Sequence, residues 1–564
     1  MISPRTLARR FAGADLVSHS RVLEIAKFID TSGVVDHVVK WRAEDGHTNS
    51  GPKVIVSDRA LFIVLQALVN DRKPFSFAGA ADMAMYRFTA ESSEYLGLTK
   101  PADRFAWEQR FRRAFHRAVG TFNPYIGNNG YRRTIAEAEA EYQRRRTDPL
   151  HKVKQSRIDV ISDALTFTSV DMLVPAEERA KYGGHVVIDG TAMPMCSQWA
   201  EPNYHHDSSA VEVDAYWWRR QKNHRHDGPE PPPESEKNGA NSAKSKWSLE
   251  LDVALWATSD PTQPAQFPLV CATVRLKRPG NRTGELALDM IRAMRRNGHN
   301  PKLLTSDMAI VPGADPEKLQ NHLYDMGIDT CIHIDEGHKG MSKDGHEGLI
   351  WVDGNPYCGA MPAKLISCTK DRHEKLISQE VFYKRLWERR RYLAKPNGKP
   401  NSKGGIQYLH PTDEAGRPVC NPGRPHAGKF CTQRSVVVPK ERLNLKYRQK
   451  YHYMGPEWAR MHFAGRSSIE GYNGTFKKVH RFGDPDQVTV RGYAAKYLAA
   501  AMMVVASNAR IVENFYRDSP DQVEARFLKA KKRRAGTWSE AMHDAEFWNK
   551  QAETVLTDED DPPE

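Results

Sequence analysis

The stretch Phe463 to Lys477, FAGRSSIEGYNGTFK, decides how the rest of the chain is interpreted. Its steps of three, four and seven residues separate an aromatic residue, an arginine, a glutamate and a lysine: Phe463, Arg466, Glu470 and Lys477. With 3.6 residues per turn, these side chains lie on one face of a helix. A carboxylate between two cations is an unusual stripe, because an amphipathic helix usually gathers apolar residues on one face and scatters its charges on the other.

The same stretch also has an apolar side, formed by Ile469, Tyr472 and Phe476, which predicts that the helix packs on a core. Its three glycines each weaken a helix by roughly 1 kcal/mol relative to Ala. We therefore expect another backbone or a ligand to come close to this helix. The alternative is a surface helix in which Glu470 and Arg466 form an i, i+4 ion pair, worth only tenths of a kcal/mol.

Length and charge limit the class of protein. A chain of 564 residues predicts two to four domains. It has 83 Lys and Arg against 70 Asp and Glu, a formal charge of +13, which favours a polyanion such as nucleic acid as partner. Seven scattered cysteines favour a reducing compartment. The beginning of the sequence lacks a secretory apolar segment, and the longest apolar run, 497–506, is too short to span a membrane. We expect a cytoplasmic protein.

Two further acidic residues follow predicted strands. Asp189 ends the β-branched run VVIDGT, and Asp307 lies near the end of PKLLTSDMAI. Between and after these strands, the periodicity predicts strands and helices in a fixed order: strands at 248–257 and 267–276, a helix at 283–297, a helix at 316–326 and a strand at 328–334. This order predicts an α/β core, a mixed five-stranded sheet with flanking helices, in which Asp189 and Asp307 end neighbouring strands.

The remaining chain divides by composition. Residues 1–150 predict helices and a DNA-binding domain; within it, the basic helix 104–119 is either a helix-turn-helix recognition element or a structural helix with an arginine face. The core is expected in two parts, 180–335 and 441–516. We expect four other features: a mobile loop at 203–246, a β-rich basic insertion at 336–440, a long apolar helix at 491–515 and a basic and acidic tail at 517–564.

Zinc ligands are one interpretation of part of the insertion. His410, Cys420, His426 and Cys431 are residue types that bind zinc, but their spacing matches no established zinc pattern. The sequence therefore leaves a zinc site in the insertion open.

Asp189, Asp307 and Glu470 are residue types that bind a hard cation. Mg²⁺ or Mn²⁺ prefers carboxylate oxygens together with substrate phosphate oxygens. Two such ions activate a water or 3′-hydroxyl and stabilise the leaving oxygen of an in-line phosphodiester displacement. Arg466 and Lys477, on the face of Glu470, would contact phosphates, as would Lys478 beside them. Phe463 would either stack on a base or pack in the core.

The motifs around Asp189, Asp307 and Glu470 resemble those of the bacterial insertion-sequence DDE transposases, which have an RNase H-like core. A large group of these enzymes carries Tyr, two residues, Arg, three residues, Glu, six residues and Lys. The sequence is similar from Phe463 through Arg466 and Glu470 to Lys477, with Phe in place of Tyr. IDGT around Asp189 also resembles the family's first-strand motif. Asp307 is followed by Met-Ala-Ile, where these enzymes often have Arg-Gly-Tyr.

The resemblance implies Asp189, Asp307 and Glu470 as catalytic, metal-binding residues with two Mg²⁺ or Mn²⁺ ions. It also implies DNA contacts by Arg466 and Lys477, cleavage at terminal inverted repeats, and joining of the 3′-OH to target DNA. It further implies a homodimer in a paired-end complex and a nucleoid-associated location. Two alternatives stay open: a domesticated transposase or other RNase H-like nuclease without strand transfer, and a catalytically decayed DNA-binding regulator.

Overall fold

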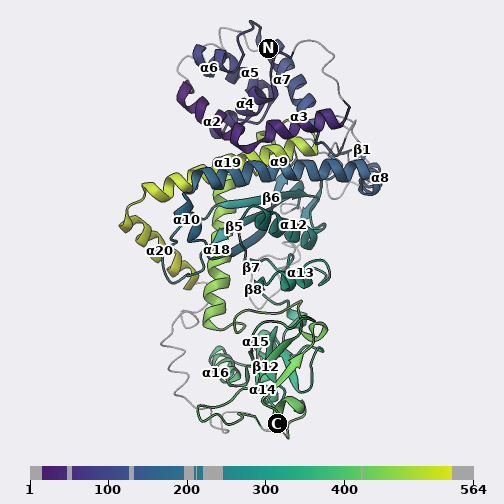
Figure 1. Ribbon diagram of the computed structural model, residues 1–564, viewed down its shortest axis with the longest axis vertical. Coiled ribbons are helices and arrows are strands. Elements are labelled where there is room, and N and C mark those ends of the chain that lie inside the picture. Colours follow the sequence, from purple (N-terminus) through teal and green to yellow (C-terminus); the bar gives the residue numbers. More distant parts are fainter. Residues whose placement is uncertain are drawn as a thin grey trace, which may run out of the picture.

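The computed structural model describes residues 16–46, 54–125, 133–195, 209–210, 212–219, 245–420 and 423–535. Along its longest axis, a group of N-terminal helices, a central sheet and a smaller unit formed by residues 336–440 follow one another (Figure 1). We call this smaller unit the insertion.

The central sheet is mixed. Its strands are β2 (His185–Pro194), β4 (Tyr216–Arg219), β5 (Ser245–Ala257), β6 (Cys271–Lys277), β7 (Leu303–Ser306) and β8 (Asp329–Thr330). β5 pairs antiparallel with β2 on one side and with β4 and β6 on the other, while β7 pairs parallel with β2 and β8 parallel with β7. The five predicted strands are therefore present in the predicted order.

The sheet has a sixth strand, so the prediction of five strands is corrected. β4 and the first residues of β5 lie within 203–246, which the sequence predicted as one mobile loop. Tyr216 to Arg219 pair with Ser245 to Ser248, and the ring of Trp217 packs edge-on against Trp247 at 5.5 Å. These aromatic residues give the segment an apolar face, which the polar composition of its neighbours concealed. A two-residue strand, β3 (Ser209–Ala210), pairs with β1 (Arg133–Thr134). Residues 196–208, 211 and 220–244 lie outside the described part.

Alternation along the strands gives the sheet two apolar faces. One face, with Val186, Ile188 and Ala254, is covered by α12 (Thr283–Arg296) and α13 (Gln320–Asp325). The other, with Val187, Leu251 and Val253, shares a core with α18 (Pro456–His480) and α19 (Tyr493–Arg517). Both faces are therefore buried, as expected of a sheet between helical layers.

The N-terminal region is helical, as predicted. Its helices are α2 (His19–Ser32), α3 (Val34–Glu44), α4 (Asp58–Asn70), α5 (Phe77–Asp82), α6 (Ala90–Tyr95), α7 (Arg104–Val119) and α8 (Ile135–Thr147). They are followed by α9 (Pro149–Leu173) and α10 (Ala176–Ala180). α9 lies alongside α19 (Figure 1), and one continuous hydrophobic core includes α2, α4, α7, α9, α19 and one face of the sheet. The N-terminal helices thus share their core with the sheet.

The insertion combines two small antiparallel sheets with helices. The strands are β9 (Leu349–Val352) with β10 (Asn355–Cys358), and β11 (Lys395–Pro396), β12 (Ile406–Leu409) and β13 (Ser435–Val438). β9 and β10 form a hairpin that turns at Asp353 and Gly354, both with positive φ. The description as β-rich omitted four helices: α14 (Ala363–Ile366), α15 (Cys368–His373), α16 (Gln379–Arg389) and α17 (Lys429–Thr432). α16 buries Phe382 and Leu386, an i, i+4 pair among charged residues.

After α19, the chain forms α20 (Pro520–Ala535), which contains the basic residues predicted in the tail; residues 536–564 lie outside the described part. Within the described ranges, no helix combines the length and the apolar character needed to cross a membrane.

Candidate active site

The parallel pairing of β2 and β7 places Asp189 and Asp307 together. The register pairs Ile188 with Ser306, the last residue of β7, so each acid is the next residue along its strand. Asp307 directly follows β7, whereas Asp189 lies inside β2, which continues to Pro194 in its pairing with β5. The prediction that both acids end their strands is therefore wrong for Asp189. The two acids still lie at neighbouring positions where β7 ends, at the edge of the parallel part of the sheet. Asp307 is exposed, and its Oδ1 accepts a 2.6 Å hydrogen bond from the Met308 backbone N–H.

Glu470 reaches this edge because α18 crosses the sheet at close range. Gly465 lies against β2: a Cβ there would stand 3.0 Å from Val187 Cγ2 and 3.3 Å from the His185 ring. The chain thus comes close at Gly465, although through side chains of β2 and not through its backbone. At Gly471 and Gly474, no atom of the described residues lies within 4 Å of an added Cβ, so the expected approach of another backbone is not seen there. One contact with the sheet therefore accounts for one glycine of the three.

Arg466 bridges two of the three acids. Its Nη1 lies 3.4 Å from Asp189 Oδ1, and its Nη2 donates to Glu470 Oε1 at 3.1 Å. The predicted i, i+4 ion pair between Arg466 and Glu470 is thus present, and it extends to the sheet. Asp189 and Arg466 are mostly buried, with 13% and 19% of their side chains exposed, whereas Glu470 is 64% exposed.

The electrostatics reflect this crowding. Burial raises the pKa of Asp189, Arg466 lowers it, and the carboxylates of Asp307 and Glu470 raise it further. Burial opposes the positive charge of Arg466, but the same three acids outweigh it and raise its pKa. All three acids therefore act on one small region around Arg466.

Asn473 is a site residue that the sequence analysis missed. Its Nδ2 donates to Asp189 Oδ2 at 3.1 Å, while its buried Oδ1 has no hydrogen-bond partner among the described residues. Asn473 follows Arg466 by seven residues and Glu470 by three, so its position on the charged stripe was readable from the sequence. An amide carries no charge, and the predicted stripe consisted of three charged residues and one aromatic residue.

The other predicted site residues lie along α18. Phe463 is half-buried and packs near Trp458 and His462, with ring centroids 5.9 and 5.4 Å away, which supports the packing interpretation. Lys477 and Lys478 are exposed in the last turns of the helix.

The arginines of α7 support the structural interpretation of that helix. Arg104 pairs with Asp82, and Arg117 with Asp58. Phe111 and Phe115 are buried in the shared core. At least two of the arginines on the helix are therefore used within the N-terminal helices themselves.

The three acids offer the type of ligand atom that a hard divalent cation prefers. They offer carboxylate oxygens, and Asn473, whose Oδ1 has no partner within the described part of the chain, adds another oxygen on the residue that bonds Asp189. Arg466 contacts two of the carboxylates, those of Asp189 and Glu470, and the third, that of Asp307, acts on it through its charge. The described residues contain one group of three or more Asp, Glu, His or Cys side chains whose ligand atoms all lie within 4.8 Å of one another. This group lies in the insertion and does not include the three acids. Arg466 thus stands between Asp189 and Glu470, where a cation would be held.

Comparison with known proteins adds nothing to this geometry: no protein-family model, no curated protein and no solved structure matches the chain.

Proposed function

We propose that this chain is a metal-dependent DDE transposase with an RNase H-like core. The observation that carries the proposal is the register of β2 and β7, which sets Asp189 beside Asp307 at the edge reached by Glu470. Three antiparallel strands, β6, β5 and β2, followed by the parallel strands β7 and β8, are compatible with such a core.

In this proposal, Asp189, Asp307 and Glu470 hold two Mg²⁺ or Mn²⁺ ions. When bound, these ions supply an activated water or 3′-OH and stabilise the leaving oxygen of the phosphodiester. Asn473 orients the Asp189 carboxylate through its hydrogen bond. Arg466, together with Lys477 and Lys478, binds DNA phosphates, so on substrate binding Arg466 exchanges a carboxylate partner for a phosphate.

The substrate is DNA. A formal charge of +13 favours a polyanion as partner. The exposed Lys477 and Lys478 at the end of α18 add positive charge beyond the acids. By resemblance to the transposases, the specific substrates are the terminal inverted repeats and a target duplex, bound by a homodimer.

The decisive experiment uses DNA carrying the inverted repeats that flank the gene of this chain. The protein is incubated with this DNA in Mg²⁺, Ca²⁺ or EDTA, and cleavage, strand transfer and binding are measured separately. The variants are Asp189→Asn, Asp307→Asn and Glu470→Gln, which keep shape and remove charge. Glu457→Gln, an exposed acid in the first turn of α18, is the matched control.

We expect Mg²⁺-dependent cleavage at the repeat boundary, lost in all three variants and kept in Glu457→Gln, with binding unchanged throughout. Strand-transfer products separate a transposase from a nuclease that only cuts. Binding without cleavage in every metal would reject the enzymatic proposal in favour of a DNA-binding regulator.

A further inference from the structure

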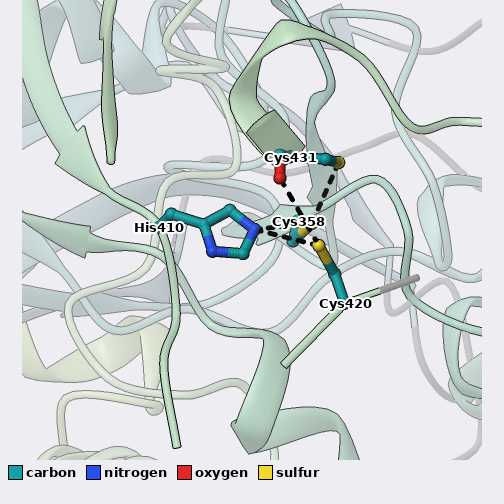
Figure 2. Close-up of side chains that lie close together, drawn as sticks. All are labelled: Cys358, His410, Cys420 and Cys431. Carbon is teal, nitrogen blue, oxygen red and sulfur yellow. Dashed lines mark hydrogen bonds between the residues drawn. The ribbon is translucent and has the colours of Figure 1, made fainter. Parts of the chain in front are cut away.

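Four metal-binding side chains from distant parts of the insertion meet at one point. Cys358 ends β10, His410 follows β12, Cys420 lies in the loop after it, and Cys431 lies on α17. All four ligand atoms are within 4.8 Å of one another. Figure 2 shows the side chains directed toward a common centre.

Three distances between the ligand atoms are close to those of a tetrahedral metal site. His410 Nε2 lies 3.3 Å from Cys358 Sγ and 3.3 Å from Cys420 Sγ, and Cys358 Sγ lies 3.3 Å from Cys431 Sγ. With Zn–S of about 2.3 Å and Zn–N of about 2.0–2.1 Å, a tetrahedral ion has ligand atoms about 3.5–3.8 Å apart. An expansion of a few tenths of an ångström would therefore admit the ion.

We propose that Cys358, His410, Cys420 and Cys431 form a structural zinc site. Three thiolates and one imidazole are a closed set with no position left for substrate, which is typical of structural zinc. This donor set selects a soft or borderline cation over Mg²⁺. The site is thus chemically distinct from the carboxylate edge of the central sheet.

The surroundings suit such a site. Cys358 and Cys431 belong to the small hydrophobic core that includes Phe430, and the Phe430 ring lies 5.1 Å from that of His410, edge to face. The ion would join β10, β12, α17 and the loop between them, and a small unit with a limited core gains stability from such a link.

The site also corrects the zinc set considered from the sequence. His426 is exposed and stays outside the cluster, and its backbone carbonyl packs against Gly359. Cys358 takes its place, 73 residues before Cys431 in the chain. The hairpin of β9 and β10 brings it there, which no local spacing reveals.

The test measures metal in the full chain, purified in reducing buffer from cells grown with zinc. Elemental analysis after dialysis against EDTA should give one zinc ion per chain for the unmodified protein. Cys420 is the least buried ligand, so Cys420→Ser should lose most of the zinc with the smallest disturbance of the core. Cys420→His restores a fourth ligand and should restore zinc.

Two matched controls come from the insertion itself. Cys368→Ser removes a buried cysteine outside the cluster, and His426→Ala removes the exposed histidine; both should keep the zinc. If Cys420→Ser fails to fold, Co²⁺ titration of the metal-free unmodified protein decides. Tetrahedral thiolate coordination then gives strong visible d–d bands and thiolate charge-transfer absorption.

Three results would overturn the proposal. These are a zinc content well below one ion with no Co²⁺ spectrum, a Cys420→Ser variant that holds zinc as firmly as the unmodified protein, and a disulfide between Cys358 and Cys431 in the protein isolated with thiols blocked.

Discussion

Arg466 Nη1 lies 3.4 Å from Oδ1 of Asp189. The same guanidinium donates to Glu470, so it neutralises two of the acids that the proposed metal ions require. Arg466 and a divalent cation therefore compete for the same carboxylates when no DNA phosphate is present to attract the arginine.

This competition predicts that Arg466→Met binds Mn²⁺ more tightly in the absence of DNA. We expect a threefold to tenfold lower dissociation constant, equivalent to about 0.7–1.4 kcal/mol, measured by calorimetry at pH 8. The pH matters because loss of the arginine raises the pKa of Asp189, and protonation would mask the gain. DNA cleavage should nevertheless fall, since a phosphate contact is lost.

Arg460→Met is the control for Arg466→Met. Arg460 lies on the same helix, and its Nε hydrogen-bonds to the Pro456 carbonyl, away from the acids. Its Mn²⁺ affinity should equal that of the unmodified protein. An unchanged or weaker affinity in Arg466→Met would show that the arginine does not occupy a cation position.

The three glycines of α18 should respond differently to substitution. Gly465→Val places methyl groups against Val187 and the ring of His185, so it should lower the melting temperature and cleavage together. Gly471→Ala and Gly474→Ala face open space on an exposed helix surface. Each should stabilise the protein by up to about 1 kcal/mol through helix propensity. Thermal unfolding of the three variants checks this order; equal destabilisation by all three would refute the placement of α18.

How far the sequence predicts the fold depends on whether a feature is local. The strand of Asp189, the strand of Asp307 and the helix of Glu470 each have a periodic local pattern, and all three are present where predicted. The parallel register of β2 and β7 follows from no local pattern. Order and length made it a reasonable expectation, and only the sheet shows the two acids at matching positions.

The features that the sequence analysis missed are mostly contacts between distant residues. Asn473 joins Asp189 across 284 positions, and Cys358 joins Cys431 across 73. The glycines illustrate the same limit, because identical residues on one helix meet a strand at Gly465 and open space at Gly471. Residue type predicts what a side chain is able to do, whereas its partner depends on the tertiary fold.

We expect a large loss of stability when the charge of Arg275 is removed. It is buried on β6, where it makes two hydrogen bonds of 2.8 and 2.9 Å to Asp163 of α9 and one of 2.7 Å to Asp289 of α12. Arg275→Met leaves the Asp163 carboxylate without its ion-pair partner, so we expect a loss of about 3–5 kcal/mol in the free energy of unfolding.

Denaturant unfolding measures this loss, and a second substitution tests its cause. Adding Asp163→Leu to Arg275→Met should recover part of the stability, because it removes the stranded charge. Arg144→Met is the comparison, since Arg144 pairs with Glu141 on the exposed side of α8 and its loss should leave unfolding nearly unchanged. A double variant less stable than Arg275→Met would mean that packing, not charge, causes the loss.

Buried histidines predict a fall in stability below neutral pH. Burial lowers the pKa of five of them to about 3 or about 4: His185, His299, His333, His462 and His480. The ordinary pKa of a histidine side chain is 6.5, so between pH 6.5 and pH 4 the unfolded chain binds more protons than the folded one. Stability is therefore fully present above pH 6.5 and decreases as the pH falls toward 4, by about 1 kcal/mol per histidine between pH 6.5 and 5.5.

Melting temperatures at pH 7.5, 6.5 and 5.5 check this dependence. In His185→Gln, the loss between pH 6.5 and 5.5 should be smaller than in the unmodified protein, whatever its stability at pH 7.5. His185 bonds through Nδ1 to the Thr258 carbonyl and through Nε2 to Thr305, so both ring nitrogens are used in the neutral form. His426→Gln changes an exposed histidine and should keep the full pH dependence. If His185→Gln loses as much stability as the unmodified protein, His185 is not among the groups that destabilise the fold in acid.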